Sequence, residues 1–260
     1  MAEADDVEEV SSLMNATLER VATTISVLGL ELAVEKTEAV YFRRKYKDHV
    51  PQIHLMGCAV PISDSMNYLG ILLDKDLMFK QHVKEVSAKA MRVANGLSRL
   101  MPNIGGPQEA RRRLLNSVVH SVLLYGAPVW ASVLQYVKAS VDTLRSVQRR
   151  VLLRNIRAYR TVSHTATNVL ASIPPVELLA VERARAYSYR GIRGTEVMDW
   201  RQQLRKRTMR EWQSELSAAT SGEWTRRFLL EVEGWATRKH GSLSFHLTQM
   251  LSGHGCFSDS

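Results

Sequence analysis

The segment GLELAVEKTEAVYF (residues 29–42) is followed by IHLMGCAVPI (53–62) and SMNYLGILLD (65–74). Short apolar runs at residues 31–34, 39–42, 53–56, 59–62 and 68–73 predict β-strands. Gly57 and Cys58 separate two of these runs and predict a hairpin turn. The stretch therefore predicts a small antiparallel sheet, in which residues 68–73 form a buried strand.

Helices are predicted on both sides of this sheet. Apolar residues at helical spacing predict a helix over residues 7–28, with Gly29 as its C-terminal stop. The same spacing predicts helices over residues 79–101, 110–124, 137–156, 163–172 and 176–189. In the helix over residues 110–124 the predicted core face consists of Leu114, Leu115, Val118, Val119 and Val122. The fold class is thus α+β, a small antiparallel sheet followed by a mostly α-helical region.

Composition limits the class of protein. With 260 residues, of which 45% are apolar, the chain can form one large or two small domains with a buried core. No apolar run of about 18 residues predicts a transmembrane helix, and the acidic start MAEADDVEEV does not resemble a signal peptide. Two cysteines, Cys58 and Cys256, do not make a disulfide framework. We expect an intracellular protein, nuclear or cytoplasmic, without a membrane partner.

The positive charge is concentrated in the middle of the chain. Residues 92–213 hold 21 Lys or Arg against seven Asp or Glu, a net +14, and most of the cations are Arg. Because Arg contacts phosphate in a bidentate manner, this region predicts a nucleic-acid-binding surface. Arg145 and Arg149 are four residues apart, as are Arg150 and Arg154, and a bound phosphate backbone would relieve their mutual repulsion. A solvated helical face is the alternative.

A second group of arginines lies near the start of the helix predicted over residues 110–124. The helix dipole disfavours cations there, so an anion such as phosphate would compensate. The candidate nucleic-acid-binding residues are therefore Arg111, Arg112, Arg113, Arg145, Arg149, Arg150, Arg154 and Arg157. Four tryptophans, Trp200, Trp212, Trp224 and Trp235, are interpreted as core anchors, with base stacking as the alternative.

Four motifs together resemble one protein family. Gly-Leu-Glu-Leu-Ala-x-x-Lys-Thr-Glu (29–38) and Tyr-Leu-Gly (68–70) precede Leu-Leu-Tyr-Gly-Ala-Pro-Val-Trp (123–130) and Leu-Thr-Gln-Met-Leu-Ser-Gly-His-Gly-Cys-Phe (247–257). In this order they resemble the reverse transcriptases of non-LTR retrotransposons, closest to the retrovirus-related Pol polyproteins of type-1 retrotransposable elements. The resemblance covers nearly the whole chain and the carboxyl half of the family's polymerase.

The resemblance implies a division of the chain. Residues 1–76 would be the carboxyl-terminal part of the polymerase palm, residues 77–190 a helical thumb-like domain, and residues 191–260 a helical linker that stops before the family's zinc cluster. His254 and Cys256 are two ligands where a zinc site needs about four, so we expect no zinc.

The resemblance also implies site residues. Asp5 and Asp6 would be the remnant of the pair that binds catalytic Mg²⁺, although two-metal chemistry needs a further carboxylate. A solvated helix start is the alternative. Lys36 would lie near the nucleotide phosphates, and Tyr68-Leu69-Gly70 would belong to the primer grip. A surface turn at Lys36 and an ordinary buried strand at Leu69 and Gly70 are the alternatives.

The implied function is that of a carboxyl-half fragment of an RNA-directed DNA polymerase. We expect the fragment to be inactive alone, to bind Mg²⁺ only weakly, and to retain binding of RNA and of the RNA–DNA template–primer duplex. The alternative is a non-catalytic, Arg-rich helical protein that binds nucleic acid or acts as a scaffold. The sequence predicts no oligomeric state.

Overall fold

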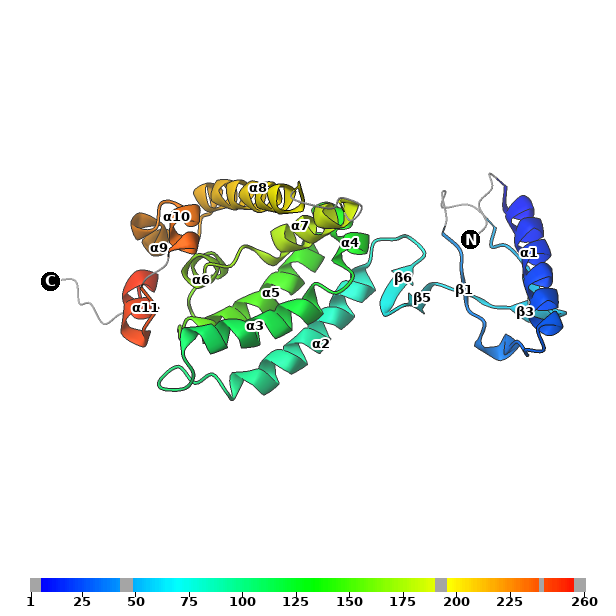
Figure 1. The fold of residues 1–260 in the computed structure, drawn as a ribbon, viewed down its shortest axis with the longest axis horizontal. Coiled ribbons are helices and arrows are strands. Elements are labelled where there is room, and N and C mark those ends of the chain that lie inside the picture. Colours follow the sequence, from blue (N-terminus) through cyan, green and yellow to red (C-terminus); the bar gives the residue numbers. More distant parts are fainter. Residues whose placement is uncertain (1–5, 43–48, 190–195, 239–240, 255–260) are drawn as a thin grey trace. The chain divides into compact units, whose positions relative to one another are not determined.

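The computed structural model describes residues 6–42, 49–189, 196–238 and 241–254 (Figure 1). The chain divides into two compact units, Met1–His82 and Val83–Ser260. All described strands lie in the first unit, and most of the helices lie in the second. The broad α+β class is therefore confirmed, whereas the assignment of palm, thumb and linker stays a prediction.

The first unit combines one long helix with short strands. Its elements are α1 (Val7–Val27), η1 (Val34–Lys36), β1 (Ala39–Val40), β2 (Ile53–Leu55), β3 (Cys58–Val60), β4 (Ile62–Ser63), β5 (Ser65–Tyr68) and β6 (Ile71–Asp74). The predicted first helix is confirmed, and Gly29, with a φ of +70°, ends it. The N–H groups of Gly29 and Leu30 donate to the carbonyls of Ser26 and Ile25, which satisfies two carbonyls of the last turn.

The prediction of a single antiparallel sheet is wrong. β2–β3 and β5–β6 are antiparallel pairs, but β1 and β4 pair in parallel, and the three pairs are separate sheets. Pro61 lacks the N–H that would extend the ladder beyond β3, so the chain leaves the first hairpin there. Residues 31–33 form no strand, and residues 34–36 form η1.

Residues 68–73 are a hairpin rather than one buried strand. The chain reverses at Leu69 and Gly70, whose φ angles are +50° and +78°. Positive φ at both central positions is the pattern of a two-residue type I′ turn. Tyr68 and Leu69 are consequently 58% and 75% exposed. The other hairpin turns at Met56 and Gly57, one residue earlier than predicted.

The second unit is helical and is built around α5 (Lys138–Asn155), which packs against α3 (Glu109–Leu123), α6 (His164–Ala171) and α7 (Val176–Ser188) (Figure 1). Helical spacing predicts an apolar side of α5 made of Val141, Leu144, Val147, Val151 and Leu152. This side is confirmed, since all of them are buried except Val141, which is partly buried. The remaining elements are α2 (Lys80–Ser98), which begins at the unit boundary, α4 (Ala127–Trp130), η2 (Ala131–Tyr136), α8 (Glu196–Ala218), α9 (Glu223–Phe228), α10 (Val232–Thr237) and α11 (Phe245–Ser252).

The predicted core face of α3 is correct only in part, since Val119 is buried and Leu115 and Val122 are partly buried. Leu114 and Val118 are 65% and 43% exposed, and the buried residues are Arg112, Asn116, Val119, His120 and Leu123. The helix is rotated away from its most apolar face because Arg112 and His120 find hydrogen-bond partners inside the fold. A buried polar group is tolerated where its hydrogen bonds are made.

No single described helix is both long and apolar enough to cross a bilayer. α3 and residues 127–136, joined at a bend of 51°, meet the length and composition criteria only as a pair.

Candidate nucleic-acid interface

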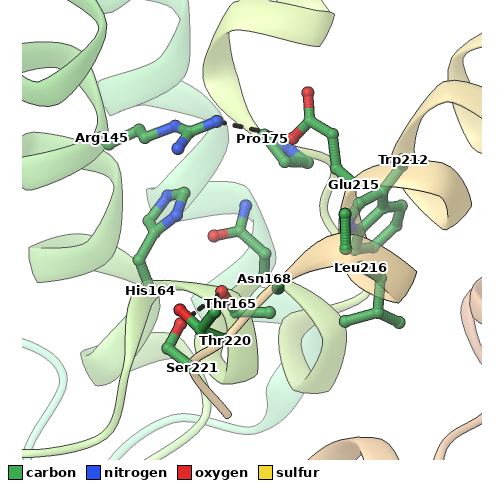
Figure 2. Close-up of a pocket in the computed structure, with 12 residues that line it drawn as sticks. Arg145, His164, Thr165, Asn168, Pro175, Trp212, Glu215, Leu216, Thr220 and Ser221 are labelled. Atoms are coloured by element: carbon green, nitrogen blue, oxygen red, sulfur yellow. Dashed lines mark hydrogen bonds and ion pairs between the residues drawn. The ribbon is translucent and has the colours of Figure 1, made fainter.

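Arg145 on α5 is already paired inside the protein. Its Nε donates to Glu177 Oε1 at 2.8 Å, and its Nη2 contacts the same oxygen. Nη2 also lies 3.4 Å from Glu215 (Figure 2). Burial lowers the pKa of Arg145, but the hydrogen bond and charge of Glu177 outweigh it, so the pKa is raised. Arg145 is therefore held as a cation by two carboxylates.

Arg149, one turn further along α5, holds a loop. Its Nε donates to the Val162 carbonyl at 2.8 Å, and its Nη2 donates to the Arg160 carbonyl. These contacts fasten the segment between α5 and α6 to the helix. The repulsion expected between Arg145 and Arg149 is thus relieved by protein oxygens, and a phosphate is not needed for it.

Arg150 and Arg154 differ from that pair, because both are exposed. Arg154 makes one long hydrogen bond, 3.4 Å from its Nη1 to Asn103 Oδ1. Within the described residues Arg150 has no hydrogen bond or ion pair. These two guanidinium groups are therefore available to a ligand.

A groove of about 550 Å³ runs between α2 and α5. Its walls are Lys84, Ser87, Ala88 and Met91 from α2, and Asp142, Thr143, Ser146 and Val147 from α5. Ser87 is 3% exposed, and its hydroxyl has no partner among the described residues. The groove therefore combines a cation, Lys84, with several hydroxyl groups.

The arginines continue this groove. Asn103, which follows α2, donates to the carbonyl of Ala158, which follows α5, so the two helices run in the same direction. Residues 146, 150 and 154 lie on one face of α5 because four residues make about one helical turn. Arg150 and Arg154 thus lie one and two turns beyond the groove wall at Ser146.

Arg112 is a structural residue. It is 1% exposed, and its guanidinium donates to the carbonyls of Pro102, Gly105, Pro107 and Arg154. Burial lowers its pKa, and the charges of Arg157 and Arg154 lower it further. A phosphate was predicted to offset the cations at this helix start. For Arg112, backbone carbonyl oxygens take that role instead.

The neighbouring candidates have different surroundings. Arg113 pairs with Glu109 at 2.6 Å, and Arg111 is exposed. Arg157 is half-buried with a φ of +59°, and its Nη2 lies 3.5 Å from the Pro107 carbonyl. The structure thus gathers Arg112, Arg154 and Arg157 at the α2–α3 loop. Of the three, Arg154 is the exposed one.

The candidates in the first unit are described separately. Asp5 lies outside the described residues, and Asp6 is the exposed residue before α1. Lys36 is exposed at the end of η1, and Tyr68 lies in the β5–β6 hairpin. In the described part of the chain, no three His, Cys, Asp or Glu residues are grouped to hold a metal ion. The catalytic, nucleotide, primer and metal roles stay predictions.

A buried polar network that the sequence pattern did not predict lies beside Arg145. Gln148 is fully buried, and its Oε1 accepts hydrogen bonds from the Val176 N–H, from Asn168 Nδ2 and from His164 Nε2. Its Nε2 donates to the Pro174 carbonyl and to His120 Nε2. Figure 2 shows His164 and Asn168 lining the pocket beside this network. The spacing of Arg112, Asn116 and His120, each four residues apart, is a signal that could have revealed a buried polar stripe on α3.

Burial keeps one member of this network neutral. It lowers the pKa of His164 to about 4, and the charges of Arg145 and Arg149 act in the same direction. The pKa of His120 is also lowered, chiefly by burial. Neutral His164 donates from Nε2 to Gln148, which fits a structural role better than catalysis.

Known proteins resemble the chain over much of its length. It is 31% identical over 151 residues to the putative 115 kDa protein in type-1 retrotransposable element R1DM of Drosophila melanogaster. It is 26% identical over 203 residues to the retrovirus-related Pol polyprotein from type-1 retrotransposable element R1 2 of Nasonia vitripennis. The chain is related to the R1 retrotransposon proteins. The predicted relationship to non-LTR retrotransposons is thereby confirmed.

These R1 relatives are longer than the part that matches. The alignments cover 58% and 73% of this chain, but 15% of the Drosophila protein and 48% of the Nasonia protein. The chain thus spans less than half the length of these two relatives. No family model matches the sequence. No solved structure matches it either.

Proposed function

We propose that this retrotransposon-derived chain is a carboxyl-half piece of an R1-type reverse transcriptase that binds the template–primer duplex along the α2–α5 groove. The observation that carries the proposal is the exposed pair Arg150 and Arg154, one turn apart beyond the groove wall. The named Pol polyproteins among its relatives support a nucleic-acid partner.

The groove suits phosphate rather than bases. Lys84, the hydroxyl of Ser146 and, beyond the wall, Arg150 and Arg154 can donate hydrogen bonds to phosphate oxygens, whereas Ala88, Met91 and Val147 are apolar and Asp142 is acidic. Phosphate contacts carry no sequence information, so binding is expected to depend little on sequence. Asp142 at the other end of the groove pairs with Lys138 at 3.3 Å, which reduces its repulsion of a phosphate.

The salt dependence of binding tests this proposal. A labelled RNA–DNA hybrid is titrated with the full chain and with the Arg150→Ala/Arg154→Ala variant over a range of salt concentrations. Each lost phosphate contact removes about 0.9 from the slope of log affinity against log salt, so the double variant should lose about 2. The matched control is Lys206→Ala/Arg210→Ala, because both residues are exposed and lie four apart on α8.

Equal slopes for the wild type and the Arg150→Ala/Arg154→Ala variant would contradict the proposal. So would an equal loss in the control, which would show a diffuse charge effect. Arg149 is unsuitable for this test, because its removal frees the loop that carries Arg160 and Val162.

We also propose that the chain alone does not extend a primer. Two-metal transfer needs carboxylates on more than one element, and Asp5 and Asp6 are neighbours in the chain. A primed RNA template with Mg²⁺ and deoxynucleotides should therefore yield no longer product. Extension by the wild type that disappears in Asp6→Ala would overturn this proposal.

A further inference from the structure

We infer that a pocket between α7 and α8 binds the unpaired bases of single-stranded nucleic acid. This site goes beyond the proposed duplex groove, because it uses different helices and a different type of contact. The pocket has a volume of about 700 Å³. It is lined by residues of α7 and α8, together with Leu124 and Pro128 near α4. α7 and α8 pack against each other, so the pocket lies within the second unit.

Aromatic rings form one side of the pocket. The rings of Tyr189 and Trp200 stack with their centroids 5.3 Å apart and their planes 16° apart. Tyr189 is 41% exposed and the neighbouring Tyr187 is 53% exposed. Trp200 supports Tyr189 from one side, and an unpaired base can extend this stack.

The same pocket carries a net positive charge. Of the described residues that line it, Arg183, Arg201 and Arg205 are basic and Glu182 is acidic. Arg205 is paired with Glu182 at 3.0 Å, and Arg183 donates to the Leu124 carbonyl at 3.2 Å. Arg201 lies over the Trp200 ring, 5.4 Å from its centroid. Its exposed guanidinium is placed to contact a phosphate next to the stacked base.

The pocket wall also holds an unused donor. The Nε1–H of Trp200 is buried and has no acceptor among the described residues. A buried donor without a partner is costly, so an oxygen acceptor on a ligand would stabilise it. Base carbonyls and phosphate oxygens both supply such an acceptor.

These features favour a single strand over a duplex. In a duplex the faces of the bases are covered by their stacked neighbours, so a tyrosine cannot reach them without unstacking. Arginine with exposed aromatic rings is the combination used for strands without base pairing. RNA and DNA share this chemistry, and the two are compared directly in the test.

The test measures binding of labelled strands of about 12 nucleotides to the full chain. The probes are oligo-dT, oligo-U and an abasic strand with the same phosphates. Each base stack contributes about 1–3 kcal/mol, so Tyr189→Leu should weaken binding of the base-bearing strands by about 5- to 150-fold. Tyr189→Phe keeps the ring and should bind like the wild type.

The matched control is Tyr136→Leu, because Tyr136 is 74% exposed and lies outside the pocket. Arg201→Ala should weaken the strands with bases and the abasic strand alike, whereas Arg210→Ala on the same helix should not. Circular dichroism verifies that each variant is folded. Because the groove contacts phosphates alone, the Arg150→Ala/Arg154→Ala variant should weaken oligo-dT and the abasic strand by the same factor, whereas Tyr189→Leu should weaken only the strands with bases. The experiment therefore distinguishes a failure of the proposal for the α2–α5 groove from a failure of the inference for this pocket.

Two results would overturn the inference. One is an abasic strand that binds as tightly as oligo-dT, which would show attraction by charge alone. The other is a folded Tyr189→Leu variant that binds oligo-dT no more weakly than Tyr136→Leu does.

Discussion

Two amphipathic helices of similar length, α1 in the first unit and α5 in the second, differ in how much they bury. No residue of α1 is buried, whereas α5 buries eight of its 18 residues. Among its described residues the first unit has a small buried cluster, Ile53, Leu55 and Val60, and α1 contacts it with partly exposed side chains. α5 instead lies between other helices. An apolar stripe thus specifies a helix, but the stability of that helix depends on the layers packed against it.

The largest expected difference concerns hydrogen exchange. Amides of α5 should exchange at least about a thousandfold more slowly than those of α1, a difference of about 4 kcal/mol in opening free energy. Mass spectrometry of peptides from both helices measures this. Similar protection in the two helices would show that burial does not distinguish the units.

Arg112→Ala should have the next largest effect, and it should fall on the second unit. The variant leaves the carbonyls of Pro102, Gly105, Pro107 and Arg154 without their donor, at a cost of about 4 kcal/mol. Urea unfolding followed by circular dichroism measures the loss. The control is Arg111→Ala, an exposed neighbour that should change stability by less than about 0.5 kcal/mol. A loss of equal size in the two variants would refute the structural role of Arg112.

Acid should destabilise the second unit through His164. Its pKa is about 4 in the fold and higher when unfolded, so between these values the unfolded chain binds more protons. Stability therefore falls as the pH is lowered from about 6.5 to about 4, by about 3 kcal/mol in total.

Unfolding by urea at several pH values measures this loss. His164→Gln, which can still donate to Gln148, should flatten the dependence on pH. The control is His246→Gln, because His246 is exposed. This variant should keep the pH dependence of the wild type. An unchanged pH dependence in His164→Gln would show that other groups cause the acid sensitivity.

The smallest expected changes in stability come from replacing two glycines, one in each unit. Gly29 has a φ of +70°, so Gly29→Ala should destabilise the end of α1 by about 1 kcal/mol. Gly96 lies inside α2 with open space around its Cα, so Gly96→Ala should stabilise by up to about 1 kcal/mol. Thermal melting measures both. Changes of the same sign would contradict the conformational argument.

One of the motifs that reveal the resemblance, residues 123–130, has a structural role in the fold. In the segment over residues 123–130, Gly126 has a φ of +64°, and Trp130 is fully buried with its Nε1–H donating to the Tyr125 carbonyl. This motif therefore fixes the turn between α3 and α4. A motif that reveals a relationship need not mark a binding site.

The candidate interface was predicted in part. The net charge of residues 92–213 and the four-residue spacing indicated arginine rows on α5, but spacing does not distinguish Arg149 from Arg150. Their difference depends on carbonyl groups at residues 160 and 162, which the fold brings to Arg149. Base stacking was an alternative for Trp200, but the pocket between α7 and α8 was not predicted. Tyr189 follows α7 and Trp200 lies in α8, so only the fold stacks their rings.

The sequence by itself determined the local features of this protein, namely its main helices, the glycine that ends α1 and the apolar side of α5. These follow from interactions within a few residues. Only the tertiary structure decided which face of α3 is buried and which arginines remain exposed. The reason is that the partners of Arg112, His120 and Arg149 are distant in sequence, and burying a polar side chain is favourable only where such partners are present.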